Sequence, residues 1–291
     1  FRGQYDKAIK YYEEALAILK KLGQEADVAT LLNNFGGVYS SWGQYDKAIK
    51  YYKEALAIAR KLGQENHIAF SLNNIGEVYR FRGQYDKAIK YYEEALAIAR
   101  KLGEEAGVAT CLSNIGNVYL SWGQYDRAIE YFKEALATFK KLGQEGSIAT
   151  LLNNIGMVYY SWGQYDKAIK YYEKALAIDK RLGREASVAA YLNNIGMVYD
   201  DWGQYDKALK YYEEALAIDK RLGREDKVAT RLNNIGSVYD DWGQSDKAIK
   251  YYEEALAIAR KLGQEADVAI RLGNIGNVYH SWGQYDKAMK Y

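Results

Sequence analysis

The 291-residue sequence contains no proline, one cysteine and two histidines. Because proline and Gly/Ser-rich stretches are missing, nothing indicates a flexible linker or a disordered tail within these residues. A lone Cys111 excludes an intrachain disulfide and favours an intracellular, cytoplasmic setting. His67 and His280 are isolated, and together with Cys111 they give no metal-ligand spacing. We therefore expect neither a metal site nor a cofactor.

Long apolar runs and charge of one sign are also missing. The longest apolar runs are a few residues, far below the roughly 20 that cross a bilayer, and no basic start precedes an apolar signal segment. The 40 lysines and arginines nearly balance the 38 aspartates and glutamates. We therefore expect no membrane insertion and no nucleic-acid partner.

A forty-residue unit recurs through the whole chain without an insertion or a deletion. A unit of this length with two helical patterns cannot bury its apolar face by itself, so the copies must stack side by side. We therefore predict an all-α solenoid and treat residues 1–291 as a single domain. The glycines that mark the period are Gly3, Gly43, Gly83, Gly123, Gly163, Gly203, Gly243 and Gly283.

The period also sets the expected repeat boundaries. Residues 1–23 hold only the second helix of a truncated repeat, and residues 264–291 form an incomplete terminal repeat. Solenoids normally need polar terminal caps, so we expect either a fragment of a longer array or molecules that associate end to end. The full repeats are expected at 24–63, 64–103, 104–143, 144–183, 184–223 and 224–263.

Each unit is predicted to contain two amphipathic helices. Apolar residues recur at three- and four-residue spacings from Gln24 to Trp42, and again from Tyr45 to Leu62. We call these helices A and B. A glycine follows each of them and is expected to end it in the left-handed conformation.

Glycine also stands inside helix A, at Gly36 and its equivalents in all seven copies. Within a helix glycine costs up to about 1 kcal/mol relative to alanine. We therefore expect a close contact there, in which Ala48 and Ala55 let the two helices approach each other.

Nine positions of the unit carry a family resemblance. They are Leu32, Phe35, Gly36, Tyr39, Gly43, Tyr45, Ala48, Tyr52 and Ala55. Their pattern resembles the tetratricopeptide repeat, whose usual unit has about 34 residues, and it covers the whole chain. The longer unit is similar to those of the LGN/Pins cell-polarity adaptors and, less closely, of kinesin light chains. The resemblance implies a right-handed superhelix of stacked antiparallel helix pairs, with the A helices lining its concave side.

One face of helix A is polar and carries asparagines. An asparagine amide has both a donor and an acceptor, which match the backbone of an extended peptide. By resemblance this face lines the inner groove, so we predict that the asparagines bind peptide. Alternatively, each asparagine bonds a neighbouring helix or a buried water and keeps adjacent repeats in register. Asn34, Asn74, Asn114, Asn154, Asn194, Asn234 and Asn274 occur in all seven copies, and Asn33, Asn73, Asn153, Asn193 and Asn233 lie beside five of them.

Other positions on this face differ between copies and are expected to select the partner. They are Arg80, Met157, Tyr160, Met197, Asp200, Asp201, Asp240 and Asp241. The four aspartates in the C-terminal half, with Arg80 and Arg82 in the N-terminal half, fit a basic or bipolar peptide. Alternatively, the aspartates form a solvated face that Arg231 and Arg271 neutralise. A calcium site is disfavoured because the carboxylates do not share one compact loop.

The motifs of known catalytic sites are missing. No nucleophile, base and orienting group recur together, and no loop would cradle a phosphate, so we expect no enzyme activity. We predict an interaction scaffold that binds an extended segment of a partner protein along the asparagine-lined concave groove. Two alternatives stay open, namely a structural module that oligomerises end to end and a regulatory sensing arm of a larger ATPase or protease.

Overall fold

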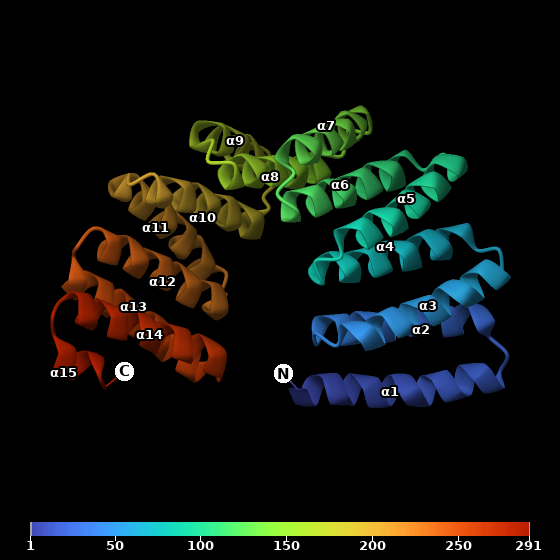
Figure 1. The fold of residues 1–291 in the computed structure, drawn as a ribbon, viewed down its shortest axis with the longest axis horizontal. Coiled ribbons are helices and arrows are strands. Elements are labelled where there is room, and N and C mark those ends of the chain that lie inside the picture. The colour runs from blue at the N-terminus through green and yellow to red at the C-terminus, as the bar shows by residue number, and fades with distance from the viewer. Residues whose placement is uncertain (1, 291) are drawn as a thin grey trace. The chain divides into compact units, whose positions relative to one another are not determined.

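A computed structural model describes the backbone of residues 2–290 and the side chains of residues 5–290. Every regular element in this range is an α-helix (Figure 1). The predicted all-α fold of stacked helix pairs is therefore confirmed. The helices are α1 (Arg2–Lys21), α2 (Glu25–Ser41), α3 (Tyr45–Lys61), α4 (Glu65–Phe81), α5 (Tyr85–Leu102), α6 (Glu105–Ser121), α7 (Tyr125–Lys141), α8 (Glu145–Ser161), α9 (Tyr165–Arg181), α10 (Glu185–Asp201), α11 (Tyr205–Arg221), α12 (Glu225–Asp241), α13 (Ser245–Lys261), α14 (Glu265–Ser281) and α15 (Tyr285–Ala288).

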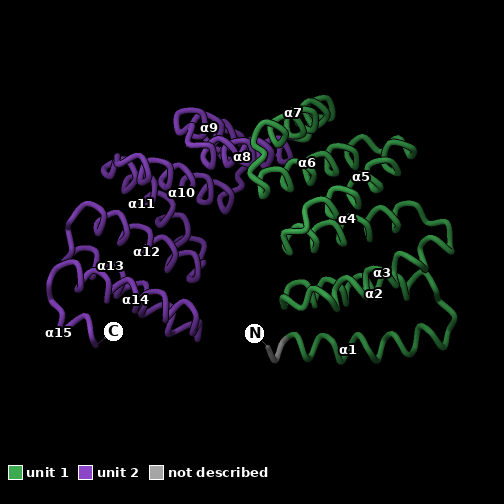
Figure 2. Tube along the Cα trace, viewed as in Figure 1, with its two compact units in different colours: residues 1–144 green, residues 145–291 purple. Residues whose placement is uncertain are grey.

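The helices fall into two compact units (Figure 2). Unit 1 covers residues 1–144 and contains α1–α7, and unit 2 covers residues 145–291 and contains α8–α15. The even-numbered helices are the A helices and the odd-numbered ones are the B helices. The A helices pack against the neighbouring B helices of the same unit. The assignment of residues 1–291 to one domain, with the repeat boundaries given above, remains a prediction.

Consecutive helices are joined by one recurring short turn. After α2, the N–H of Gly43 bonds to the carbonyl of Ser40 at 3.0 Å, and the N–H of Gln44 bonds to the carbonyl of Tyr39 at 2.8 Å. These two bonds around a left-handed glycine form a Schellman closure. Glycines with φ between 65° and 75° occupy all fourteen turns of the described residues, as predicted. Proline is incompatible with the position of Gln44, because that N–H is needed for the closure.

The glycine inside helix A packs against an aromatic ring of helix B. A Cβ added at Gly156 would lie 2.7 Å from the ring of Tyr172, and one added at Gly116 would lie 2.6 Å from Phe132. Both rings are buried. A close contact at this glycine was correctly predicted, but a ring makes it instead of the small alanines, because only a flat side chain fills the gap that glycine leaves.

The apolar spacing predicts that Trp42 and its equivalents, at the ends of the A helices, are buried. The structure shows that these tryptophans are less buried than predicted. Trp122 is 37% exposed and Trp202 is 40% exposed. The indole of Trp122 packs on Tyr119 of its own helix, at 6.2 Å between ring centres, and on Tyr85 of the preceding helix B at 5.6 Å. The periodicity finds the correct side of the helix, but at the helix end one face of the indole stays in water.

Candidate functional site

Each A helix has a polar side that carries the asparagines, and the apolar residues next to them in the sequence are largely buried. We call it the asparagine face: the side of each A helix that carries Asn34 or its equivalent. On α2, Leu32 and Phe35 flank this residue and are buried, whereas Asn34 itself is exposed. Asn33 is only 5% exposed and donates to the carbonyl of Ala29 at 3.2 Å. The two neighbouring asparagines therefore differ in their access to a partner.

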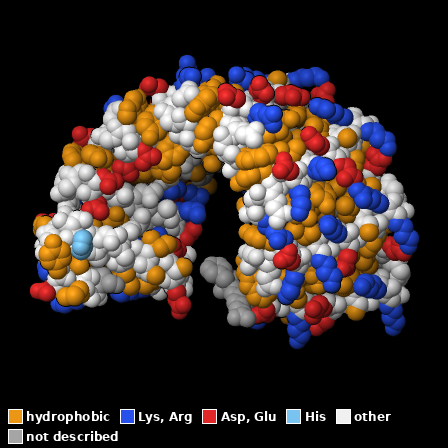
Figure 3. All heavy atoms as spheres, in the orientation of Figure 1, with side chains coloured by type: hydrophobic (Ala, Val, Ile, Leu, Met, Phe, Trp, Pro, Cys, Tyr) orange, Lys and Arg blue, Asp and Glu red, His pale blue; other side chains and the backbone are white. Residues whose placement is uncertain are grey.

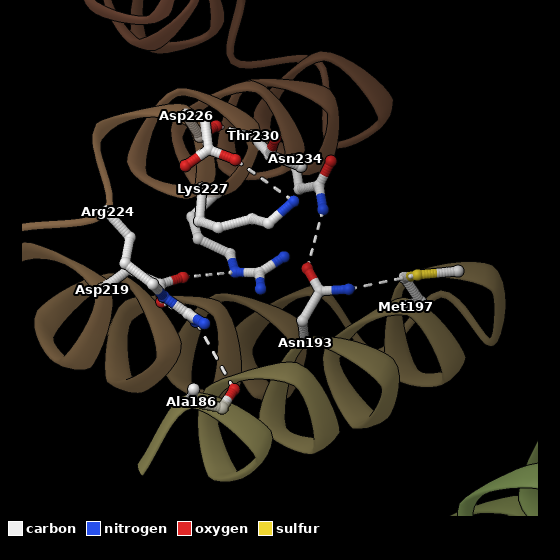
Figure 4. Close-up of polar contacts among 10 residues, drawn as sticks. Ala186, Asn193, Met197, Asp219, Arg224, Asp226, Lys227, Thr230 and Asn234 are labelled. Carbon is white, nitrogen blue, oxygen red and sulfur yellow. Dashed lines mark hydrogen bonds and ion pairs between the residues drawn. The ribbon is translucent and has the colours of Figure 1, made fainter. Parts of the chain in front are cut away.

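Asparagines of successive A helices bond to each other within each unit. In unit 1, Asn114 Nδ2 donates to Asn73 Oδ1 at 3.2 Å. In unit 2, Asn234 Nδ2 donates to Asn193 Oδ1 at 2.9 Å (Figure 4). The same bond joins Asn194 to Asn153 at 2.8 Å and Asn274 to Asn233 at 3.0 Å. These are inter-repeat contacts of the kind that the register alternative predicts.

The inter-repeat bond holds each of these amides in one orientation. It uses one N–H of the constant asparagine, and the side-chain oxygens of Asn114, Asn194 and Asn234 accept no hydrogen bond from the described residues. These three side chains are partly exposed. An oriented carbonyl group and a second N–H thus remain for an incoming backbone.

Two methionines of the predicted selective set contact Asn193 and Asn153, the asparagines that accept the inter-repeat bonds. Asn193 Nδ2 lies 3.4 Å from Met197 Sδ, and Asn153 Nδ2 lies 3.6 Å from Met157 Sδ. Met157 is 41% exposed. These flexible side chains give the asparagine face of unit 2 an adaptable apolar component.

Four carboxylates gather on the asparagine face of unit 2 and form what we call the aspartate cluster. Asp200 and Asp201 end α10, and Asp240 and Asp241 end α12. Tyr160 of α8 donates its hydroxyl to Asp201 Oδ2. Asp200 Oδ1 is buried without a hydrogen bond. Burial, together with the charges of Asp241 and Asp201, raises the pKa of Asp200 to about 7. Burial and aspartate neighbours also raise the pKa of Asp240 and of Asp241.

The suggestion that Arg231 and Arg271 neutralise this cluster is wrong. Both arginines are buried. Arg231 Nε bonds to Asp219 Oδ2 at 3.1 Å, and Arg271 Nη1 bonds to Asp267 Oδ1 at 2.7 Å. Arg231 lies nine residues before Asp240 on α12, or roughly 13 Å along the helix axis. The cluster thus has no arginine counter-ion from these positions.

The arginines expected at a basic end of the groove are already paired. Arg80 Nη2 lies 2.6 Å from Glu77 Oε1, and its guanidinium lies 4.5 Å from the ring centre of Phe81. Arg82 is ion-paired with Asp46. These contacts offset the positive charge that the acidic end of a bipolar peptide would need.

Sequence analysis missed several residues that the structure makes conspicuous. Phe70 and Phe81 of α4 are 57% and 53% exposed, eleven residues apart and thus on one side of the helix with Asn74. Asp179 and Asp219 are fully buried. The sequence did contain a signal for the two acids, since each stands where other repeats have alanine, leucine or phenylalanine and each is followed five residues later by arginine.

Neither a metal centre nor a membrane span is found in the described part of the chain. No group of three or more histidine, cysteine, aspartate or glutamate side chains there is arranged to hold a metal ion. None of its helices combines the length and the apolar character that crossing a bilayer requires.

The raised pKa of Asp200 predicts how stability depends on pH. Its pKa rises from 3.8 to about 7 on folding, so between these values the folded state binds more protons than the unfolded state. Stability should therefore fall as the pH rises through this window, and Asp200→Asn should flatten that slope. Urea unfolding at several pH values across the window measures it, with the exposed Asp206→Asn as the control. A slope that Asp200→Asn leaves unchanged would contradict the assignment.

Comparisons with known proteins agree with this architecture. BtubC (BKLC) from P. vanneervenii aligns with 28% identity and a TM-score of 0.63, over 76% of this chain and 92% of that chain. A Rap protein complexed with competence and sporulation factor aligns with 18% identity and a TM-score of 0.60, over 94% and 85%. The Signal Transduction ATPase with Numerous Domains from Pyrococcus horikoshii, which has a tetratricopeptide repeat sensor, gives 18% identity and a TM-score of 0.72, over 97% of this chain and 43% of that chain.

The sequence comparisons show to which family this chain belongs. No curated protein matches the sequence. The profile of the tetratricopeptide repeat, however, matches residues 1–61, 67–141, 147–221, 187–261 and 227–291. These ranges include nearly every residue and both compact units, and the resemblance predicted from the nine recurring positions is confirmed. The chain therefore belongs to the tetratricopeptide repeat family.

Proposed function

We propose that this chain binds an extended, basic segment of a partner protein along the asparagine face. Tetratricopeptide repeats generally serve as protein–protein interaction scaffolds, and the Rap structure named above is a complex with competence and sporulation factor. The observation that carries the proposal is the row of amides, as at Asn194 and Asn234, whose orientation an inter-repeat bond fixes while the side-chain oxygen accepts no bond.

The expected spacing of the repeats suits an extended chain. Packed helices lie about 8–10 Å apart, and an extended peptide advances about 3.3 Å per residue. One constant asparagine would therefore meet about every third peptide residue. Contacts with the backbone give affinity for any extended sequence, so selectivity must come from neighbouring side chains.

The aspartate cluster is the proposed source of this selectivity. Besides burial, the charges of Asp241 and Asp201 raise the pKa of Asp200, and the charge of Asp241 raises the pKa of Asp240, so a lysine or arginine of the partner would relieve this repulsion. Binding of a cation favours the ionised form of Asp200. We therefore expect the affinity for a basic peptide to decrease as the pH falls below about 7.

Two matched sets of substitutions test the role of the amides. The triple variant Asn194→Ala, Asn234→Ala, Asn274→Ala removes the proposed contact groups and also breaks the inter-repeat bonds. The control variant Asn153→Ala, Asn193→Ala, Asn233→Ala breaks the same bonds from the acceptor side but keeps the constant asparagines. We expect the first variant to bind a basic peptide from a display selection at least about tenfold more weakly than the parent, and the control to stay within about threefold of it.

Binding is measured by fluorescence anisotropy, and urea unfolding shows that both variants are folded. An equal loss of affinity in both would mean that the asparagines act only between repeats. Enrichment of peptides without basic residues would contradict the role of the aspartate cluster.

A further inference from the structure

A groove lies between the B helices α3 and α5 of unit 1, away from the asparagine face. Its cavity has a volume of about 760 Å³, within the range of roughly 300–1,000 Å³ that is common for ligand sites. Leu56 and Ala57 of α3, Tyr79 of α4 and Tyr91 of α5 line it. The rings of Tyr79 and Tyr91 stack with their centres 5.4 Å apart. The groove thus has an aromatic and aliphatic floor.

Positive charge surrounds this floor. Arg60 is ion-paired with Glu94, the one carboxylate in the lining. Lys87 Nζ bonds to a side-chain oxygen of Gln84 at 2.9 Å. Lys53 and Lys90 also line the groove, and neither makes an ion pair with a described residue. Figure 3 shows apolar side chains with both basic and acidic ones around them over the part of unit 1 where α3 and α5 lie.

The next groove of the same unit provides an internal comparison. It lies between α5 and α7, has a volume of about 460 Å³ and repeats the arginine, leucine and alanine of the first groove. Glu93 stands there in place of Lys53, and Glu130 stands in place of Lys90. Each groove is formed by two successive B helices and the A helix between them. Because the second groove has glutamates at the positions of Lys53 and Lys90, the packing of the fold does not require lysine there. Lys53 and Lys90 therefore make the α3–α5 groove more basic than the α5–α7 groove.

We propose that the α3–α5 groove is a second interaction site, which binds an acidic segment of a partner protein. Carboxylates of the segment would pair with Lys53 and Lys90, and a leucine or aromatic side chain between them would lie on Leu56 and Tyr79. Pairing next to an apolar floor is stronger than pairing in open water, because the surroundings screen the charges less. The two faces of the array would then bind segments of opposite charge.

Binding of a labelled acidic peptide to the full chain tests this site. The probe is a short peptide of alternating glutamate pairs and leucines, measured by fluorescence anisotropy. Lys53→Glu combined with Lys90→Glu gives this groove the residues of its neighbour, so the fold should tolerate the change. We expect binding at least about tenfold weaker in this variant, since like charges then face the peptide.

The reverse exchange provides a gain of binding. Glu93→Lys with Glu130→Lys should make the α5–α7 groove basic, so that titration calorimetry detects a second equivalent of peptide. An affinity unchanged by the Lys53 and Lys90 reversal would overturn the proposal, as would a gain variant that binds no additional peptide. The Asn194→Ala, Asn234→Ala, Asn274→Ala variant should bind the acidic peptide as the parent does, which separates this site from the asparagine face.

Discussion

Asp219→Ala is expected to lower the free energy of unfolding by about 3–5 kcal/mol, because it leaves a buried guanidinium without its counter-ion. Asp219 is fully buried and joins two arginines. Arg224 Nε donates to Asp219 Oδ1 at 2.9 Å, and Arg231 Nε donates to Asp219 Oδ2 at 3.1 Å. Arg231 is only 6% exposed, so water cannot replace the lost carboxylate. Urea denaturation followed by circular dichroism measures the loss.

The chain itself provides the control for this prediction. At the three equivalent positions an earlier repeat has Ala59, Gln64 and Ser71, and both Ala59 and Ser71 are fully buried. The triple variant Asp219→Ala, Arg224→Gln, Arg231→Ser installs that neutral set. Replacing a buried ionic group as a whole is often close to neutral, so the triple variant should be clearly more stable than Asp219→Ala. If both lost the same stability, the ion pairs would not explain the effect.

Gly156→Ala is expected to destabilise the chain by about 1–3 kcal/mol through overpacking, although alanine is the better helix former. The new Cβ would lie 2.7 Å from the ring of Tyr172, which is 2% exposed and cannot move away without disturbing the core. The clash should therefore exceed the gain in helix propensity. Thermal and urea unfolding of the variant determine the sign.

Gly273→Ala is the matched control within another A helix. A Cβ at Gly273 would have no heavy atom within 4 Å apart from its chain neighbours and the backbone of its own helix, so only the helix propensity should change. We expect this variant to be more stable than the parent by up to about 1 kcal/mol. If both substitutions stabilised the chain, the contact with Tyr172 would have to be softer than the geometry indicates.

Much of the fold follows from the sequence because the helix boundaries predicted for one forty-residue unit apply to every copy. The predicted end of helix B at Leu62 agrees with α3, which ends at Lys61, within one residue. The side chain that fills the space at Gly36 was harder to predict. Periodicity shows that Tyr52 and Ala48 both point inward, but it does not tell which of them reaches the glycine. That depends on the crossing of the two helices, which the sequence pattern does not contain.

The candidate site was predictable only in part, because the sequence pattern does not contain the arrangement of the helices relative to one another. Helical spacing predicts that the constant asparagines share one face of helix A, and Asn194 of α10 and Asn234 of α12 are both partly exposed. The bond from Asn234 to Asn193 spans 41 residues and depends on the rotation between successive repeats. The sequence also placed the charge of Arg231 near the aspartates, whereas the buried carboxylate of Asp219 pairs with it. Pairing between buried charges requires the packed structure.

The uniform turns have a consequence for how such a chain can change over time. All fourteen junctions between described helices use a left-handed glycine, so duplication or loss of one forty-residue unit recreates an existing junction. Recombination between near-identical coding segments could therefore lengthen or shorten the array without inventing a new boundary. Residues such as Arg80, which differ from their equivalents in other repeats, would travel with their unit. The number of units in the array and the side chains on its surface can then change independently of each other.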